Sequence, residues 1–177
     1  HEAVRTDGSG TDRPAVHAQT SATYRLLDEL RRRHPGLDIE SCSSGGARVD
    51  LGVLERTDRV WTSDCNDALE RVAIQRWTGL LVPPERMGTH IGPPTAHTTH
   101  RHLDLSLRML VALGGHAGLE WDITTCSTDE LDALRAWSAL YRELRPLLHG
   151  GDAVRSDHPD PALVVGGVVA PDRSAAV

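Results

Sequence analysis

Three polar segments contain the residues best suited to chemistry, and each follows a short apolar run. They span residues 40–48, 62–67 and 121–122. Asp64 comes shortly after the apolar pair Val60-Trp61 and just before a stretch with helical spacing. Partial shielding from water at such a position raises the pKa of a carboxyl group toward the range that a general acid needs. The competing interpretation is that Asp64 or Asp67 caps the following helix.

Cys42 is the second candidate. A cysteine can act as a nucleophile when a histidine lies close to it. The Ser-Ser-Gly-Gly sequence that follows Cys42 fits another role at least as well, because glycine allows the backbone to approach a ligand closely.

Four histidines, at positions 90, 97, 100 and 102, gather in one segment. Imidazole is a common metal ligand, but the spacing matches no standard zinc pattern and prolines interrupt it. We therefore interpret the segment as a polar loop on the face of the site, and we expect no metal.

Several neighbouring residues have expected roles in structure or binding. Trp61 and Trp121 are candidates for core packing or for a face on which a ligand stacks, and for Trp61 core packing is the preferred interpretation. Arg48 and Asp50 are expected to fix their loop by an ion pair. Asp122 either supports the structure or lines the site.

Hydrophobic spacing and helix caps predict the elements that position these residues. Thr20 or Ser21 is expected to cap the first helix, and Ser127 or Thr128 is expected to start the last one in a pattern that resembles a capping box. The predicted helices span residues 20–33, 68–77, 103–113 and 127–148. The predicted strands span residues 37–41, 60–62, 80–82 and 118–122, with loops at 1–14 and 83–102.

Strands that alternate with helices in this way are typical of a parallel α/β barrel. The four βα steps in residues 1–150 would make up about half of such a barrel. From Val154 onward the pattern changes to strands without helices, so residues 151–177 are expected to begin a C-terminal β domain. A whole barrel usually needs about 250 residues. With 177 residues and a first residue that is not Met, the chain looks cut at both ends.

Composition bears on which partners the protein binds and on the cell compartment in which it works. The formal net charge is −6, with acidic and basic residues interspersed, which argues against the basic patch of a nucleic-acid-binding protein. No apolar run approaches the ~18 residues of a membrane span, and no secretion signal is visible in residues 1–20. Three widely spaced cysteines indicate reduced thiols, so we expect a cytoplasmic protein.

Two longer motifs resemble a known family. They read E-S-C-S-S-G-G-A-R-V-D at residues 40–50 and V-W-T-S-D-C-N-D-A-L-E-R at residues 60–71. Their sequence and separation are similar to those of glycoside hydrolase family 36, which consists mainly of α-galactosidases. The resemblance implies a retaining mechanism in a (β/α)8 TIM barrel without cofactor or metal. It also implies that residues 1–150 form the second half of that catalytic barrel. It also implies that Asp64 is the general acid/base and that Cys42 and Gly45 contact the galactose.

The family's nucleophile is the aspartate of a K-W-D segment, and this sequence has no lysine at all. We therefore expect the nucleophile outside this chain, before His1. The expected substrates are α-galactoside oligosaccharides of the melibiose or raffinose type, and the full-length protein could be a homo-oligomer. Three alternatives stay open. They are a galactosyl-transferring relative, a relative that accepts N-acetylgalactosamine, and a non-catalytic galactose-binding fragment or truncated paralogue.

Overall fold

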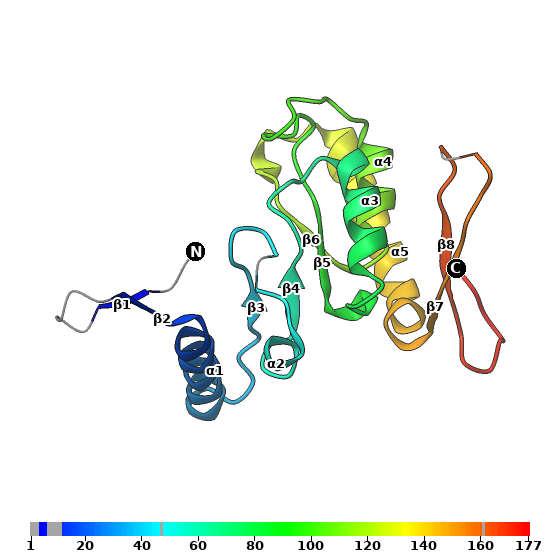
Figure 1. Cartoon of the computed structure of the whole chain (residues 1–177). Helices are drawn as coiled ribbons and strands as arrows, with labels where there is room; N and C mark the ends of the chain where they lie inside the picture. Colours follow the sequence, from blue (N-terminus) through cyan, green and yellow to red (C-terminus); the bar gives the residue numbers. More distant parts are fainter. Residues whose placement is uncertain (1–3, 7–11, 47, 161) are drawn as a thin grey trace.

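A parallel four-stranded sheet forms the centre of the molecule (Figure 1). The computed structural model describes residues 4–6, 12–46, 48–160 and 162–177. The sheet order is β3 (Glu40–Ser41), β4 (Arg59–Trp61), β5 (Met87–Ile91) and β6 (His116–Leu119). Every neighbouring pair is parallel, so the carboxyl ends of all four strands share one edge.

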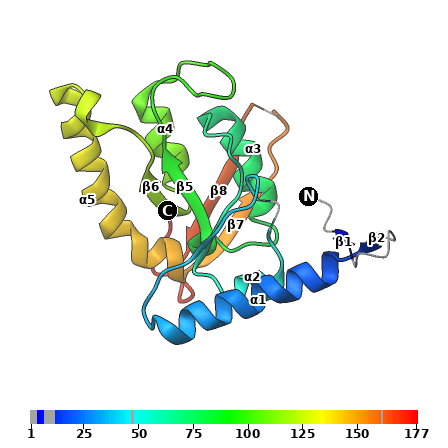
Figure 2. The same ribbon diagram turned by 90° about the vertical axis from the view of Figure 1, so that its left-hand side faces the viewer.

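A helix follows each of the last three strands. These helices are α3 (Ala68–Thr78), α4 (Leu105–Ala112) and α5 (Thr128–Gly150). They lie together on one side of the sheet, as Figures 1 and 2 show. The βα alternation predicted from the sequence is therefore present, and it directs each strand's C-terminal loop to the same end of the molecule.

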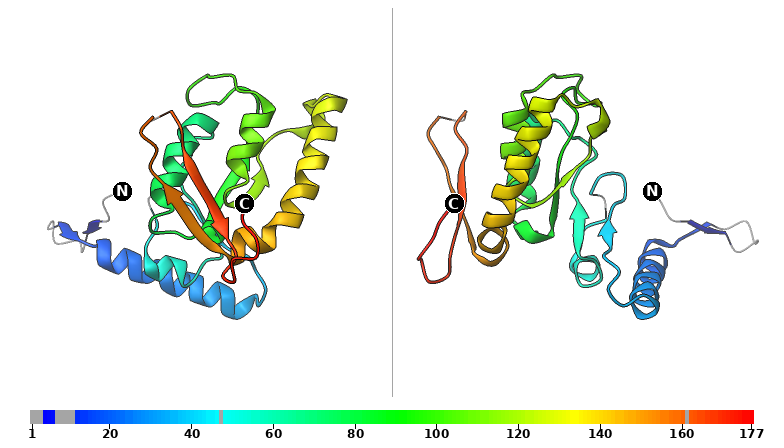
Figure 3. Two further views of the ribbon diagram at one scale, coloured as in Figure 1. Left: turned by 90° about the vertical axis from the view of Figure 1, so that its right-hand side faces the viewer. Right: turned by 180° about the vertical axis from the view of Figure 1, so that it is seen from behind.

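The remaining elements precede the sheet, follow it, or connect its strands. Before the sheet come the antiparallel strands β1 (Val4–Thr6) and β2 (Asp12–Pro14) and helix α1 (Val16–Arg33), and the short α2 (Leu51–Leu54) joins β3 to β4. Two 3-10 turns, η1 (Pro84–Arg86) and η2 (Ile123–Thr125), precede β5 and follow β6. The strands β7 (Asp152–Ser156) and β8 (Val165–Val169) form an antiparallel hairpin after α5. Figure 3 shows this hairpin beside the helices.

Small aliphatic clusters hold the layers together. Val60 of β4 packs with Val82 and Met87. Ile91 of β5 packs with Ala112 and Leu134 from α4 and α5. A third cluster, of Tyr141, Leu148 and Val168, joins α5 to the hairpin. The sheet, its helices and the hairpin are thus continuous through buried side chains.

The structure corrects three of the predicted elements. Residues 80–82 are not a strand: they form a turn, and Val82 points into the first core cluster. The third strand is β5, which the sequence analysis placed in a long loop. In the described part of residues 1–14, strands β1 and β2 replace the predicted loop, and the rest of that loop lies outside the described residues.

The first helix begins four residues earlier than predicted. Helix α1 starts at Val16, with Ala15 at the N-cap position and no side-chain cap. Thr20 lies inside the helix, where its hydroxyl donates to the carbonyl oxygen of Val16. Among the described residues, no helix is long and apolar enough to cross a membrane.

Candidate active site

Two loops at the shared sheet edge touch directly. Ser44, Gly45 and Gly46, in the loop after β3, all have positive φ, at 48°, 58° and 88°. A Cβ atom on Gly45 would overlap the backbone nitrogen of Asp64 and lie 3.0 Å from its Cγ. A Cβ atom on Gly46 would overlap the carbonyl oxygen of Thr62. The glycines thus allow the β3 loop to pack against the backbone that carries Asp64, and the structure brings two predicted site residues together.

Asp64 lies at the tip of the β4 loop with its side chain exposed. Cys42 is also exposed, at the start of the β3 loop. The expected shielding of Asp64 from water is therefore wrong for the described chain, because no described element covers the loop tip. An exposed carboxyl group at this edge is open to a ligand.

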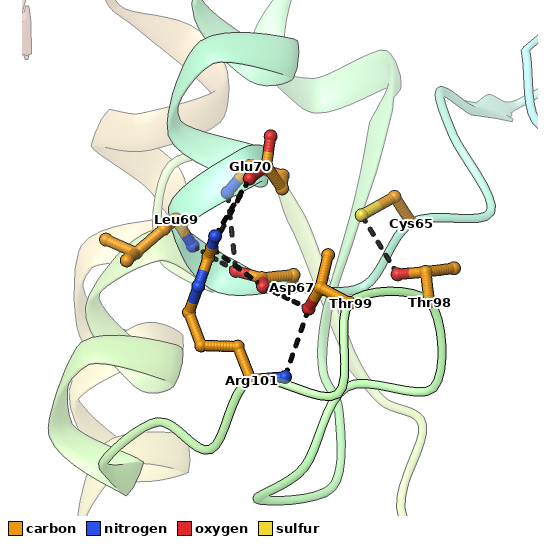
Figure 4. A network of polar contacts seen from close by, with 7 residues as sticks. All are labelled: Cys65, Asp67, Leu69, Glu70, Thr98, Thr99 and Arg101. Carbon is orange, nitrogen blue, oxygen red and sulfur yellow. Dashed lines mark hydrogen bonds and ion pairs between the residues drawn. The ribbon is translucent and has the colours of Figure 1, made fainter.

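Asp67 caps helix α3, as predicted, and it is the centre of a polar network (Figure 4). Its side chain has no exposed surface, and its Oδ1 accepts from the backbone N–H groups of Leu69 and Glu70. Its Oδ2 accepts from Thr99 Oγ1 at 2.5 Å and from Arg101 Nη1 at 2.8 Å. Burial alone would raise the carboxyl pKa, but these hydrogen bonds and the Arg101 charge outweigh it and leave the pKa lowered.

This network joins the loop after β5 to the loop after β4. Thr98 and Thr99 both reach across, because Thr98 Oγ1 lies 3.3 Å from Cys65 Sγ (Figure 4). The three histidines at 97, 100 and 102 are exposed on the β5 loop. In the described part of the chain, no group of histidine, cysteine or carboxylate side chains is arranged to hold a metal ion.

His90 belongs to strand β5 rather than to the predicted polar loop. Its ring stacks on Trp61 with a centroid distance of 4.3 Å. The guanidinium of Arg71 also lies over Trp61, 4.0 Å from its ring centroid. Trp61 is only 7% exposed, so the core-packing interpretation of this residue is confirmed.

Glu120 connects β6 to the same loop. Its Oε2 accepts from Asn66 Nδ2 and is hydrogen-bonded to His90 Nδ1, each at 3.2 Å. Sequence reasoning missed Glu120, Arg71 and Arg101 as parts of the site. Arg71 ends the second motif and Glu120 lies near the end of a predicted strand, so the sequence does contain a signal for both. The residues to which they bond, however, depend on how the strands pair.

Other residues near the site have structural contacts. Asp50 does not pair with Arg48 as predicted. It caps α2 through the N–H of Val53 and accepts from the Tyr24 hydroxyl at 2.6 Å. Asp122 caps the 3-10 turn η2 through the N–H of Thr124.

Trp121 packs partly buried against the cluster around Ile91. The guanidinium of Arg108 lies 4.7 Å from the Trp121 ring centroid. The described contacts of Trp121 are therefore those of a packing residue, the first of its two expected roles.

Comparison with known proteins identifies the family. The model of the family described as Melibiase matches residues 2–151. The chain belongs to the Melibiase family. It is 50% identical over 165 residues to an α-galactosidase of Escherichia coli, covering 93% of this chain and 23% of that protein. The α-galactosidase AgaA of Geobacillus stearothermophilus is 36% identical over 143 residues. The chain thus spans less than a quarter of the length of these relatives.

Solved structures of Melibiase relatives have the same fold. The AgaA variant of G. stearothermophilus in complex with 1-deoxygalactonojirimycin, a glycoside hydrolase family 36 enzyme, superposes with a TM-score of 0.86 at 35% identity. That match covers 90% of this chain and 22% of AgaA. An α-galactosidase from Lactobacillus brevis gives a TM-score of 0.84 over 88% of this chain and 21% of its own. The predicted family and the α/β barrel fold class are therefore confirmed.

Proposed function

We propose that this chain supplies the acid/base part of the active site of a retaining α-galactosidase. Asp64 is the general acid/base, and Cys42 and Gly45 bind the galactose. The contact between Gly45 and the backbone of Asp64 is the observation that supports this most directly, since it puts the two motifs at one position. The α-galactosidase relatives support it as well, and further AgaA variants are known in complex with raffinose and stachyose.

The proposed reaction has two steps. In the first, the Asp64 carboxyl group protonates the glycosidic oxygen while a second carboxylate attacks the anomeric carbon. In the second, the Asp64 carboxylate takes a proton from the water that releases galactose. The two carboxyl groups of a retaining pair lie about 5–5.5 Å apart. We propose that the second one comes from polypeptide outside this chain.

The division of the chain and its location are part of the same proposal. Residues 1–150 belong to the catalytic barrel and residues 151–177 to a following β domain, which the antiparallel hairpin after α5 supports. The proposed location is the cytoplasm, supported by three free cysteines. Substrates are terminal α-galactosides such as melibiose or raffinose.

The test is the Asp64→Ala variant of the full-length protein that contains this chain. Hydrolysis of melibiose, whose sugar leaving group needs a proton, is expected to fall by a factor on the order of 10²–10⁴. Azide, a nucleophile that needs no general base, should partly restore turnover of an activated galactoside as galactosyl azide. Asp132→Asn, on the exposed face of α5, is the matched control.

Full melibiose turnover by the Asp64→Ala variant would refute the assignment. Galactose binding without turnover in the unmodified protein would favour the non-catalytic alternative. A substrate panel with N-acetylgalactosaminides and sugar acceptors separates hydrolysis of galactosides from the two related activities.

A further inference from the structure

Arg71 is a buried cation next to the acid/base loop. It lies in the first turn of α3, and only 2% of its surface is exposed. Burial lowers its pKa to about 10, although the charges of Cys65, Glu120 and Asp64 act in the opposite direction. A buried charge is costly unless it is compensated, so its contacts indicate what the position provides.

Among the described residues, the guanidinium donates hydrogen bonds to neutral oxygen atoms only. Nη1 donates to Thr62 Oγ1 and Nη2 donates to the carbonyl oxygen of Ser63, each at 2.6 Å. The Nε atom is buried too, and within the described residues it has no acceptor. These contacts compensate the buried charge of Arg71 poorly, so they contribute little to stability. They do, however, hold Thr62 and Ser63, the two residues that directly precede Asp64.

The planar face of the guanidinium is also fixed. It lies 4.0 Å from the centroid of Trp61, whose other neighbour is the ring of His90. This cation–π contact helps to hold the guanidinium in place while its N–H donors bind residues 62 and 63. The position of residues 62–63 is therefore determined by the sheet through Arg71.

The other side of the loop is held independently. Asn66 donates to Glu120 at 3.2 Å, and Asp67 is fixed by Thr99, Arg101 and the start of α3 (Figure 4). Asp64 and Cys65 lie between these two anchored pairs. The exposed carboxyl group of Asp64 thus belongs to a two-residue segment that is held in place on both sides.

We propose that Arg71 is a positioning residue for the Asp64 general acid. It holds Thr62 and Ser63 so that the carboxyl group of Asp64 meets the glycosidic oxygen. The inference rests on the proposed function of Asp64. It gives the arginine that ends the second motif a specific role: an intact two-pronged donor at position 71.

The test compares leaving groups in the full-length protein. Melibiose needs a proton on its departing oxygen, whereas α-galactosyl fluoride departs with little help from a general acid. For Arg71→Met, we expect kcat/KM for melibiose to fall by about 100-fold, the scale of an ångström-sized misplacement, while kcat/KM for the fluoride changes little. Arg71→Lys keeps the charge but lacks the planar fork, so it should recover only part of the loss.

Arg76→Met, on the same helix but bonded to Asp157, is the matched control and should leave both rates unchanged. An equal loss on both substrates, or no loss, would overturn the inference, since a purely structural role has no leaving-group dependence. If Arg71→Met fails to fold, the Lys variant decides by the same criterion.

Asp64→Asn separates the two claims in the same assays. If it hydrolyses melibiose normally, the proposed function itself fails. If it does not, while the Arg71 variants show no leaving-group dependence, only the role of Arg71 is wrong.

Discussion

At the scale of single residues, Gly45 is restricted in two ways. Its φ of 58° lies in the left-handed region, and a Cβ atom would overlap the backbone of Asp64. Gly36 has the first restriction alone, with a φ of 91° and open space where a Cβ atom would lie. The pair therefore separates a backbone effect from an effect on the site.

Gly45→Ala should displace the Asp64 loop and reduce melibiose turnover of the full-length protein by about 100-fold. Gly36→Ala should cost about 1 kcal/mol of stability, for the left-handed backbone, with normal turnover. Steady-state kinetics and thermal melts of both variants check this. Equal activity in the two variants would contradict a role for the Gly45 contact.

Asp67 makes a prediction about pH. Its folded pKa is lowered below the unfolded value, near 3.9, so its contribution to stability is present above that value and lost as pH falls through the folded pKa. Asp67→Asn should cost about 2 kcal/mol near neutral pH, a modest value for a buried carboxylate because Arg101 is partly exposed.

Melting curves from pH 7 down to pH 3 measure this difference between the parent protein and Asp67→Asn. The gap should be constant above about pH 5 and should narrow progressively as the pH falls below about 3.9 toward the lower folded pKa of Asp67. Glu70→Gln removes the exposed partner of the same arginine and should change stability by less than about 0.5 kcal/mol. A gap as large at pH 3 as at pH 7 would show that the charge of Asp67 is not the cause.

At the scale of elements, the sequence was sufficient to predict a helix or strand where the residues that determine it are close together in the chain. The capping box at the start of α5 is present as predicted, with Ser127 Oγ accepting from the N–H of Glu130 and the Glu130 carboxylate accepting from the N–H of Ser127. Strand β5 was missed because its side chains do not show a strand pattern. Gly88 leaves room for Trp61 and Glu40, and His90 stacks on Trp61. The residue types at these two positions thus depend on contacts with neighbouring strands and not on a pattern within β5.

The same distinction applies to the site. Asp64, Gly45 and the cap at Asp67 could be identified from motifs and spacing. The hydrogen bond from Asn66 to Glu120 joins residues 54 positions apart, and it depends on the pairing of β4, β5 and β6. Such partners follow from the sheet order and not from any one segment.

The capping box can be tested by itself. Ser127→Ala should destabilise the protein by about 1 kcal/mol, because the N–H groups at the start of α5 lose an acceptor. Ser138→Ala, in the middle of the same helix, should be neutral or slightly stabilising because alanine favours helix. Thermal melts of the two variants measure the difference, and an equal change in both would argue against the cap.

At the scale of the whole molecule, apolar surface remains uncovered in the described chain. Leu51 and Leu81 are 84% and 85% exposed, and Trp77 and Leu110 are also exposed. A groove of about 450 Å³ between α3, α4 and the β7–β8 hairpin is lined mainly by aliphatic residues. Exposed patches of this kind favour association.

The 177 residues produced alone are therefore expected to self-associate and to show no melibiose hydrolysis. Size-exclusion chromatography with light scattering measures the mass, and an environment-sensitive dye reports the exposed apolar surface. A monodisperse species of 19.2 kDa that melts cooperatively would contradict this expectation.

The contact between Gly45 and Asp64 also constrains how such a site can change over generations. In the proposed site, a substitution that enlarges Gly45 shifts the neighbouring Asp64 loop at the same time. Substitutions that change substrate preference are therefore expected to change proton transfer as well. Directed evolution toward a new sugar should accordingly diversify both loops in one library, because libraries that vary a single loop will consist largely of inactive members.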